Sequence, residues 1–227
     1  MSPPSRVPVR APVRAMVLAA GRGERMRPLT DSCPKPLLPV RGKPLIVHHL
    51  EKLARLGVQE VVINLSWLGG AIRAALGNGE RWNLRLRYSE EGETALETGG
   101  GIFRALPWLG PEPFLVVNGD VHTDFDFAAL SLHEEALGAL VLVPNPAHHS
   151  HGDFSLEQGH VLEQGAPRWT YAGIGLYRPG LFAGCQPGRF PLLPLLRRAI
   201  AQRRLEGQLY QGAWSDVGSV ERLAALQ

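Results

Sequence analysis

The chain has 227 residues, of which 24 are basic and 21 acidic, and it contains only three lysines and six aspartates. Three of the basic residues, Arg6, Arg10 and Arg14, lie in a Pro-rich first segment, which leaves 21 basic residues against 21 acidic ones over residues 15–227. This neutral body lacks the basic surface expected of a nucleic-acid-binding domain. The length suffices for one domain with a sizeable core, and 44% hydrophobic with 20% charged residues is ordinary for a globular protein.

The sequence contains no candidate for a membrane anchor or a secretion signal. Its apolar runs are shorter than the ~20 residues of a membrane-spanning helix, and the run at residues 15–20 is too short for a signal peptide. The two cysteines, Cys33 and Cys185, have no metal-binding spacing and predict free thiols in a reducing compartment. We therefore expect a cytoplasmic protein that binds neither membranes nor nucleic acids, is a monomer or a weak homo-oligomer, and has a disordered basic tail at residues 1–14.

Residues 15–143 alternate apolar runs with amphipathic stretches, an order typical of an α/β fold with a largely parallel sheet. The first helix is well delimited, because Pro44 can open it, apolar residues follow at helical spacing, and Gly57 can end it. The predicted strands are 15–20, 60–65, 84–89, 114–118 and 139–143. Further helices are predicted at 68–76, around 102–106, and from Asp126 to about Ala136.

The character of the sequence changes after residue 143. Residues 144–190 contain three short predicted strands, 154–156, 161–163 and 171–177, separated by Gly, Pro and His residues. This pattern predicts an antiparallel layer appended to the α/β half. Two more helices are expected at 191–202 and 220–226. We predict one domain over residues 15–227, composed of the halves 15–143 and 144–227.

A glycine-rich turn leaves the first predicted strand, with the sequence LAAGRGERMRPLT at residues 18–30. Gly21 and Gly23 allow a tight turn whose backbone N–H groups can face an anion, and Arg25 and Arg27 add charged donors. The pattern predicts a phosphate-binding turn; a glycine-rich strand exit without a ligand is the alternative. It is not a dinucleotide fingerprint, which needs a third glycine where Met26 stands, nor a P-loop.

Lys35 follows ten residues after Arg25 and lies between Pro34 and Pro36. The two prolines disfavour a helix and hold the chain extended, so the lysine is presented from a stiff segment. Such a lysine is suited to act as a fixed point charge for a phosphate. A solvated loop lysine is the alternative interpretation.

These two elements and several later segments resemble the sugar-phosphate nucleotidyltransferase family. The matching segments are LAAGRGERMRPLT with the Lys-Pro pair, LETGGGI at 96–102, VNGD at 117–120, GDF at 152–154, GIG at 173–175 and WSDVG at 214–218. They are collinear and cover nearly everything after residue 14. Within the family, the resemblance is greatest to the branch of uridylyltransferases that act on N-acetylmuramate 1-phosphate in peptidoglycan recycling.

The resemblance implies a fold and a reaction. The fold is that of the nucleotide-diphospho-sugar transferases, a Rossmann-like, mostly parallel sheet flanked by helices, with a small antiparallel sugar-binding layer. Residues 15–143 would mainly bind the nucleotide and residues 144–227 mainly the sugar phosphate. In the reaction, a sugar 1-phosphate oxygen attacks the α-phosphorus of a nucleoside triphosphate and pyrophosphate leaves. The expected binding partners are therefore these two small-molecule substrates.

The expected substrate pair is UTP with N-acetylmuramate 1-phosphate. GTP with mannose 1-phosphate, and dTTP or UTP with glucose 1-phosphate, are the alternatives within the family. A non-catalytic nucleotide-sugar sensor is the alternative from another class, although such a module has little need for the charged residues that the motifs contain.

The resemblance also assigns site residues. Mg²⁺ is the implied cofactor, and Asp120 and Asp216 are its implied ligands. Arg25 and Lys35 are the implied catalytic residues, because they stabilise charge in the transition state. The nucleotide is expected to contact Gly21, Gly23, Glu24, Arg25, Lys35, Glu97, Gly99 and Asn118. The sugar phosphate is expected to contact Asn118, Asp153, Glu163 and Gly173, with a capped turn as the alternative role for Asp153.

Three histidines, His148, His149 and His151, lie in the loop PNPAHHSHGD at residues 144–153. Adjacent histidines on a loop of this kind do not easily converge on one ion, so we do not predict a metal site there. We expect a loop on the substrate side that orders on binding. Asp124 and Asp126 are expected to start the following helix instead of extending a metal cluster.

Overall fold

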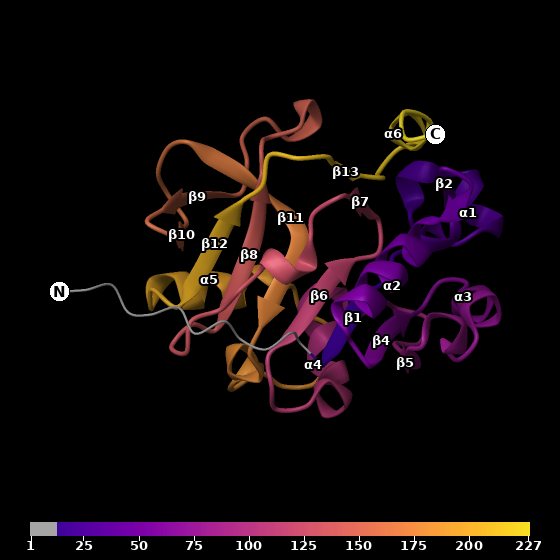
Figure 1. The fold of residues 1–227 in the computed structure, drawn as a ribbon, viewed down its shortest axis with the longest axis horizontal. Helices are drawn as coiled ribbons and strands as arrows, with labels where there is room; N and C mark the ends of the chain where they lie inside the picture. Colours follow the sequence, from indigo (N-terminus) through magenta and orange to yellow (C-terminus); the bar gives the residue numbers. More distant parts are fainter. Residues whose placement is uncertain (1–12) are drawn as a thin grey trace.

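One nine-stranded sheet runs through residues 13–227, which are the residues that the computed structural model describes (Figure 1). The strand order across the sheet is β5-β4-β1-β6-β11-β8-β12-β10-β9. The strands of this sheet are β1 Arg14–Leu18, β4 Glu60–Leu65, β5 Arg85–Glu90, β6 Phe114–Asn118, β8 Gly138–Val143, β9 Phe154–Glu157, β10 His160–Leu162, β11 Arg168–Tyr177 and β12 Leu205–Leu209.

The first half of the sheet is parallel, as the alternating sequence predicts. Strand β1 pairs in parallel with β4 on one side and with β6 on the other, and β4 pairs in parallel with β5. The carboxyl ends of these four strands therefore meet at one edge of the sheet, which is where α/β proteins bind their ligands. The glycine-rich turn leaves β1 at that edge.

The second half of the sheet is mostly antiparallel. The long strand β11 lies between β6 and β8 and runs antiparallel to both. The three short strands predicted in residues 144–190 are present, and they continue the same sheet through β11. Strand β12, for which the sequence analysis expected no element, pairs in parallel with β8. The fold class is confirmed as α/β with a mixed central sheet.

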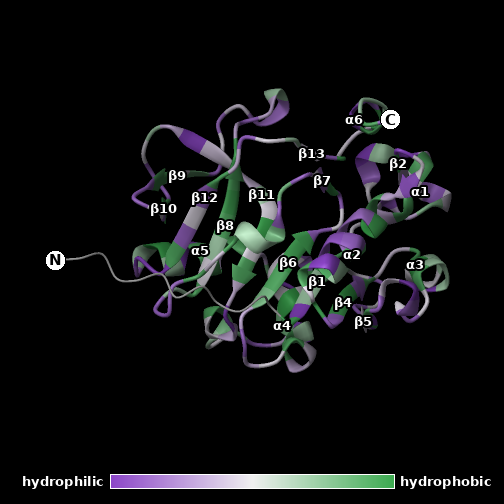
Figure 2. Ribbon diagram, in the orientation of Figure 1, coloured by the Kyte–Doolittle hydropathy of each residue, from purple (hydrophilic) through white to green (hydrophobic). Residues whose placement is uncertain are grey.

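Helices cover both faces of the sheet and create three layers. Successive residues of β1 show the division, because Ala15 and Val17 belong to one buried cluster and Met16 to the other. Helices α2 and α3 pack on the first face, and α4 and α5 on the second. Figure 2 shows the hydrophobic colour concentrated along the central strands. The helices are α1 Leu29–Ser32, α2 Leu45–Leu56, α3 Gly69–Leu76, α4 Glu97–Leu109, α5 Leu193–Ala201 and α6 Val220–Ala224.

A small ribbon and the C-terminal helix complete the edge at which the parallel strands end. Strand β7, Val121–Thr123, pairs antiparallel with β13, Trp214–Asp216, and a second short ribbon joins β2, Pro39–Val40, to β3, Lys43–Pro44. Helix α6 then lies beside β2 (Figure 1). Val217 and Leu223 pack there with Met26, Leu38 and Val40, so the C-terminal segment is fixed next to the glycine-rich turn.

The helix predicted from Asp126 to about Ala136 is wrong. Asp126 caps only a short 3-10 turn, Phe127–Ala129, and the following residues are irregular up to β8. Side chains from elsewhere bind this backbone instead. The His133 N–H, which in a helix would donate to Ala129 O, donates to Glu206 Oε2 at 3.2 Å, and Arg178 Nε and Arg204 Nε donate to Ala136 O and Glu135 O at 3.1 and 2.7 Å. Because tertiary contacts satisfy this backbone, the apolar side chains reach the core without helical geometry.

The predicted tail, residues 1–14, lies almost entirely outside the described residues. Its last residue is part of the domain, since Arg14 begins β1 and its guanidinium donates to Leu109 O at 3.4 Å. None of the helices between residues 13 and 227 is long and apolar enough to cross a membrane.

Candidate functional site

Two adjoining cavities lie where the parallel strands end. The first has a volume of about 530 Å³ and extends from the glycine-rich turn to the start of α4. The second, of about 330 Å³, lies between β7, β11 and β13. Arg25, Asn118 and Asp120 line both, so the two cavities form one continuous cleft. Of the residues predicted to bind nucleotide, the first cavity is lined by Gly21, Gly23, Glu24, Arg25, Lys35, Glu97 and Asn118.

The glycine-rich turn needs a glycine at position 23. Gly23 has a φ of +68°, in the left-handed region that side chains disfavour, and a Cβ there would lie 3.0 Å from Thr30 Cγ2 and 3.4 Å from Lys35 Cβ. Thr30 Oγ1 donates to Gly23 O at 2.9 Å. The turn is thereby packed directly against the lysine segment, which brings the two predicted phosphate-binding elements together.

Two other arginines of this turn hold its outer side. Arg22 Nη1 donates to Thr30 O at 3.0 Å, and its guanidinium lies 3.5 Å from the ring centroid of Trp67. Asp31 pairs with both Arg22 and Arg27, at 3.0 and 2.9 Å. The hydrogen bond from Arg22 is the main reason that the pKa of Asp31 is lowered. Arg27, which the sequence analysis offered as a phosphate donor, therefore pairs with Asp31 outside the cleft lining.

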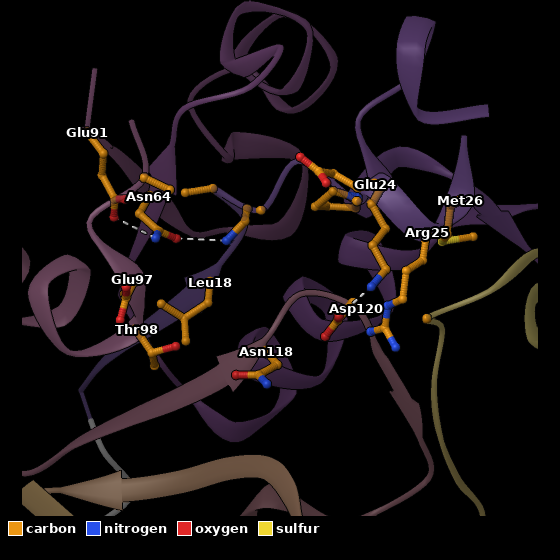
Figure 3. Close-up of a pocket in the computed structure, with 18 residues that line it drawn as sticks. Leu18, Glu24, Arg25, Met26, Asn64, Glu91, Glu97, Thr98, Asn118 and Asp120 are labelled. Carbon is orange, nitrogen blue, oxygen red and sulfur yellow. Dashed lines mark hydrogen bonds and ion pairs between the residues drawn. The ribbon is translucent and has the colours of Figure 1, made fainter. Parts of the chain in front are cut away.

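Three charged groups meet at the centre of the cleft. Lys35 is 9% exposed, and its Nζ lies 2.5 Å from Asp120 Oδ2. Arg25 is exposed, and Figure 3 shows its side chain beside Asp120. Within residues 13–227, Arg25 forms no ion pair, so its guanidinium is available to an anion. The lysine can likewise exchange its carboxylate partner for a phosphate oxygen.

The β7–β13 ribbon brings the two predicted metal ligands together. Asp216 lies opposite Val121 in this ribbon, and Val217 N donates to Asp120 O at 2.7 Å. Asp216 Oδ1 lies 3.1 Å from His148 Nε2 and 3.3 Å from Arg222 Nη1. Neither contact has hydrogen-bond geometry, so this buried carboxylate oxygen has no hydrogen-bond partner. Both carboxylates line the cavity between β7, β11 and β13.

A buried pair that the sequence analysis did not assign to the site fixes the far wall of the first cavity. Asn64 Oδ1 accepts from Ala19 N at 2.7 Å, and Asn64 Nδ2 donates to Glu91 Oε1 at 2.7 Å (Figure 3). The other oxygen of Glu91 accepts from Leu96 N at 2.7 Å. The pair therefore links the ends of β1, β4 and β5 to the start of α4. A polar residue near the end of the apolar run EVVINL was the available sequence signal for Asn64.

Two predicted glycines have packing roles. Gly99 is absent from the cavity lining, because a Cβ there would point at Phe190, 2.6 Å from its Cδ2. Gly173 has a φ of +72° and lines the second cavity. A Cβ at Gly173 would lie 2.7 Å from Asn118 Nδ2, so this glycine leaves the space that the Asn118 side chain occupies.

Two predicted sugar-binding residues lie in a separate cavity of about 410 Å³. Glu163 pairs with Arg197 at 2.8 Å and does not line the cleft. Asp153 does not line the cleft either, but it contacts residues that do. Its Oδ1 lies 3.0 Å from His149 Nε2, and its Oδ2 accepts from Tyr171 N at 2.7 Å. Asp153 thus holds His149 and Tyr171, which line the second cavity, from behind the cleft wall.

The sequence matches the family model described as nucleotidyl transferase over residues 14–157. An N-acetylmuramate alpha-1-phosphate uridylyltransferase of Neisseria meningitidis serogroup B is 50% identical over 224 residues, with 95% of this chain and 97% of that protein covered. The protein of the same name from Caulobacter vibrioides is 36% identical over 233 residues, covering 95% and 96%.

The fold is similar to that of a Bacillus anthracis crystal structure assigned as a glucose-1-phosphate thymidylyltransferase in complex with a sucrose. The TM-score is 0.81 at 19% identity, over 94% of this chain and 93% of that one. These matches agree with the cleft at the carboxyl ends of the parallel strands and with the motifs that line it. The chain belongs to the nucleotidyl transferase family.

Proposed function

We propose that the protein transfers a uridylyl group from UTP to N-acetylmuramate α-1-phosphate, with release of pyrophosphate. The observation that carries this proposal is the junction of the two cavities at Arg25, Asn118 and Asp120. A triphosphate in the first cavity and a sugar phosphate in the second would meet at these side chains. The choice of substrates is supported by the identity to the two uridylyltransferases.

The cleft suits a reaction that needs charge stabilisation and positioning more than acid–base catalysis. A sugar phosphate is already ionised at neutral pH, so its oxygen can attack the α-phosphorus without a general base. Lys35 and Arg25 are placed to stabilise the additional negative charge that develops on the phosphoryl oxygens. Gly21 and Gly23 leave the backbone of the turn free to approach the triphosphate closely.

We further propose that Mg²⁺ is the cofactor and that Asp120 and Asp216 hold it. The fit rests on the buried Oδ1 of Asp216, which has no hydrogen-bond partner, and on Asp120 Oδ1, which is not engaged by Lys35. Between residues 13 and 227 no group of three or more His, Cys, Asp or Glu side chains could hold an ion. Two carboxylates supplemented by substrate phosphates and water are a common Mg²⁺ arrangement, and the bound ion would neutralise phosphate charge.

We also place the reaction in the cytoplasm, as a step of peptidoglycan recycling. Support for a reducing compartment comes from Cys33 and Cys185, which are both free thiols.

A substrate panel tests the proposal. The full chain is incubated with each of UTP, GTP and dTTP, paired with N-acetylmuramate, N-acetylglucosamine, mannose and glucose 1-phosphates, and pyrophosphate release is followed. We expect the highest kcat/KM with UTP and N-acetylmuramate 1-phosphate, loss of turnover in a chelator, and recovery with Mg²⁺. A higher kcat/KM for another pair would change the substrate assignment, and no turnover with any pair would overturn the proposed reaction.

A further inference from the structure

The second cavity, between β7, β11 and β13, contains two histidines that the proposed reaction does not use. Among the side chains that line this cavity, those able to carry a positive charge are Arg25, His148 and His149. Arg25 also lines the cavity assigned to the triphosphate, and His148 contacts the proposed metal ligand Asp216. Of these three residues, His149 is therefore the one that contacts neither the proposed phosphate site nor the proposed metal ligand.

The structure fixes the orientation of His149. Its Nε2 lies 3.0 Å from Asp153 Oδ1, while Asp153 Oδ2 accepts from Tyr171 N on β11 at 2.7 Å. The carboxylate therefore connects the histidine ring to the strand that also contains Gly173. The other ring nitrogen, Nδ1, has no hydrogen-bond partner among the residues that the structure describes. The side chain is 42% exposed, so Nδ1 is accessible to a ligand.

The loop around His149 is organised by its own polar contacts. Asn145 Nδ2 donates to Ser150 O at 3.1 Å and to Arg168 O at 3.0 Å. Arg168 in turn donates to His151 O at 3.2 Å and to Asp153 O at 2.5 Å. These bonds hold the histidine loop against β11 without a ligand, and a preorganised group loses less entropy on binding than a mobile one.

The sugar named in the proposed function has an additional charge to accommodate. N-acetylmuramate differs from N-acetylglucosamine by a lactyl ether whose carboxylate is ionised at neutral pH. This anion would enter a cavity that already contains Asp120 and Asp216, so it needs a donor of its own. A positively charged histidine can donate from both ring nitrogens, so His149 can donate one N–H to Asp153 and the other to the lactyl carboxylate.

We propose that His149 binds the lactyl carboxylate of the sugar phosphate through Nδ1, with Asp153 as the positioning residue behind it. This inference rests on the proposed function and adds a specificity determinant to it. The contact is to a substituent of the sugar ring and not to the reacting phosphates. It should therefore lower KM for the muramate substrate more than it changes kcat.

The test compares two substrates that differ only in the lactyl group. With UTP and Mg²⁺, kcat and KM are measured for N-acetylmuramate 1-phosphate and N-acetylglucosamine 1-phosphate. We expect the wild-type chain to favour the muramate substrate. In His149→Ala, kcat/KM for that substrate should fall by about tenfold to a hundredfold, mainly through KM, because a charge-assisted hydrogen bond is lost. The value for N-acetylglucosamine 1-phosphate should change by less than about twofold.

His151→Ala is the matched control, because His151 belongs to the same loop but does not line the cleft. This variant should leave kcat/KM unchanged for both substrates. Three outcomes would overturn the inference while leaving the uridylyl transfer intact. In His149→Ala, kcat/KM could fall equally for both substrates or for neither. The wild-type chain could also show no preference for the muramate substrate. A wild-type chain that converts neither sugar phosphate with UTP would instead overturn the proposed function, and this inference with it.

Discussion

The contact between Lys35 and Asp120 places a nearly buried ammonium group at the point where the two cavities meet. A lysine held in this way is oriented before a substrate arrives, so little reorganisation is needed when negative charge develops beside it. Its neighbour Arg25 has a different character, because it is exposed and forms no ion pair within the described part of the chain. One cation is therefore fixed and the other is free to follow the phosphates.

Replacing Lys35 should affect the chemical step selectively. In Lys35→Ala we expect kcat to fall by about 10²–10³-fold, the usual effect of removing one preorganised donor to a transition-state anion. Steady-state pyrophosphate release measures this. Lys43→Ala is the control, because Lys43 pairs with Glu51 at 2.7 Å outside the cleft lining. Equal activity of Lys35→Ala and wild type would show that the lysine only supports the turn.

Asp216 gives a second prediction at the residue scale. Asp216→Asn keeps the shape of the side chain but removes its charge, so the Mg²⁺ concentration needed for half-maximal turnover should rise by at least about tenfold. A titration of turnover with Mg²⁺ measures the change, and Asp126→Asn, on the 3-10 turn after β7, serves as control. An unchanged Mg²⁺ requirement in Asp216→Asn would assign the metal to other groups.

Single residues were predictable where a motif identified them. Gly23, Arg25 and Lys35 lie within about 12 residues of one another, and their chemistry could be argued from the turn itself. Asp120 and Asp216 are 96 positions apart, so only the family resemblance could pair them. Sequence alone could not show that Asp153 and Glu163 lie outside the cleft lining, because sequence position reveals the loop a residue belongs to, and not the direction of its side chain.

At the scale of elements, α2 contains a buried ionisable group that links its packing to pH. His49 is fully buried beside Phe127, and neither ring nitrogen has a hydrogen-bond partner. Burial lowers the pKa of His49 to about 3, with a smaller contribution from the charge of Lys52, and the nearby Val121 backbone does not offset this. The folded chain therefore keeps this histidine neutral at pH values where the unfolded chain protonates it.

The direction of the pH effect follows from this difference. The unfolded state takes up a proton as the pH falls through about 6.5, while the folded state does not until the pH is near 3. Stability from the neutral ring is present above about pH 6.5 and is lost below it. By about pH 5 the loss is about 2 kcal/mol.

Replacing His49 should remove that loss. Between about pH 7.5 and 5, the free energy of unfolding should fall by about 2 kcal/mol less in His49→Leu than in wild type. Urea denaturation at the two pH values measures it. His160→Leu, on β10, tests whether loss of any histidine has the same effect. Equal pH dependence in His49→Leu and wild type would mean that His49 is protonated in the folded state.

Elements were predictable where local signals and tertiary contacts agree. Strands β4 and β6 match the predicted ranges, and Gly57 ends α2 in a left-handed conformation as its position suggested. The segment 127–136 has apolar residues that suit a helix, but the His133 N–H that a helix would use donates to Glu206 Oε2, and Arg178 and Arg204 bind carbonyl groups at the end of the segment. No local pattern contains those two arginines, which lie 42 and 69 positions from the carbonyl groups they bind.

At the scale of the whole molecule, the two halves share one sheet. Strand β11 belongs to the second half but lies between β6 and β8 of the first, and β12 pairs with β8 on its other side. This order could not be predicted from the sequence, because strand neighbours are set by long-range pairing and not by local pattern. Residues 15–143 and 144–227 are therefore parts of one sheet and not two separately folded units.

The interleaved sheet predicts a single cooperative transition for the full chain. Trp214 bridges the halves, since its Nε1 donates to Ala172 O at 2.9 Å and its strand pairs with β7. Unfolding followed by tryptophan fluorescence and by far-ultraviolet circular dichroism should give coincident curves. Residues 1–143 alone would leave one side of β6 and both sides of β8 without partners. Such unpaired edges favour association between chains, so this fragment should aggregate and show no sharp transition. A fragment that is monomeric and melts cooperatively would show that the first half folds independently, with β11 added to a finished sheet.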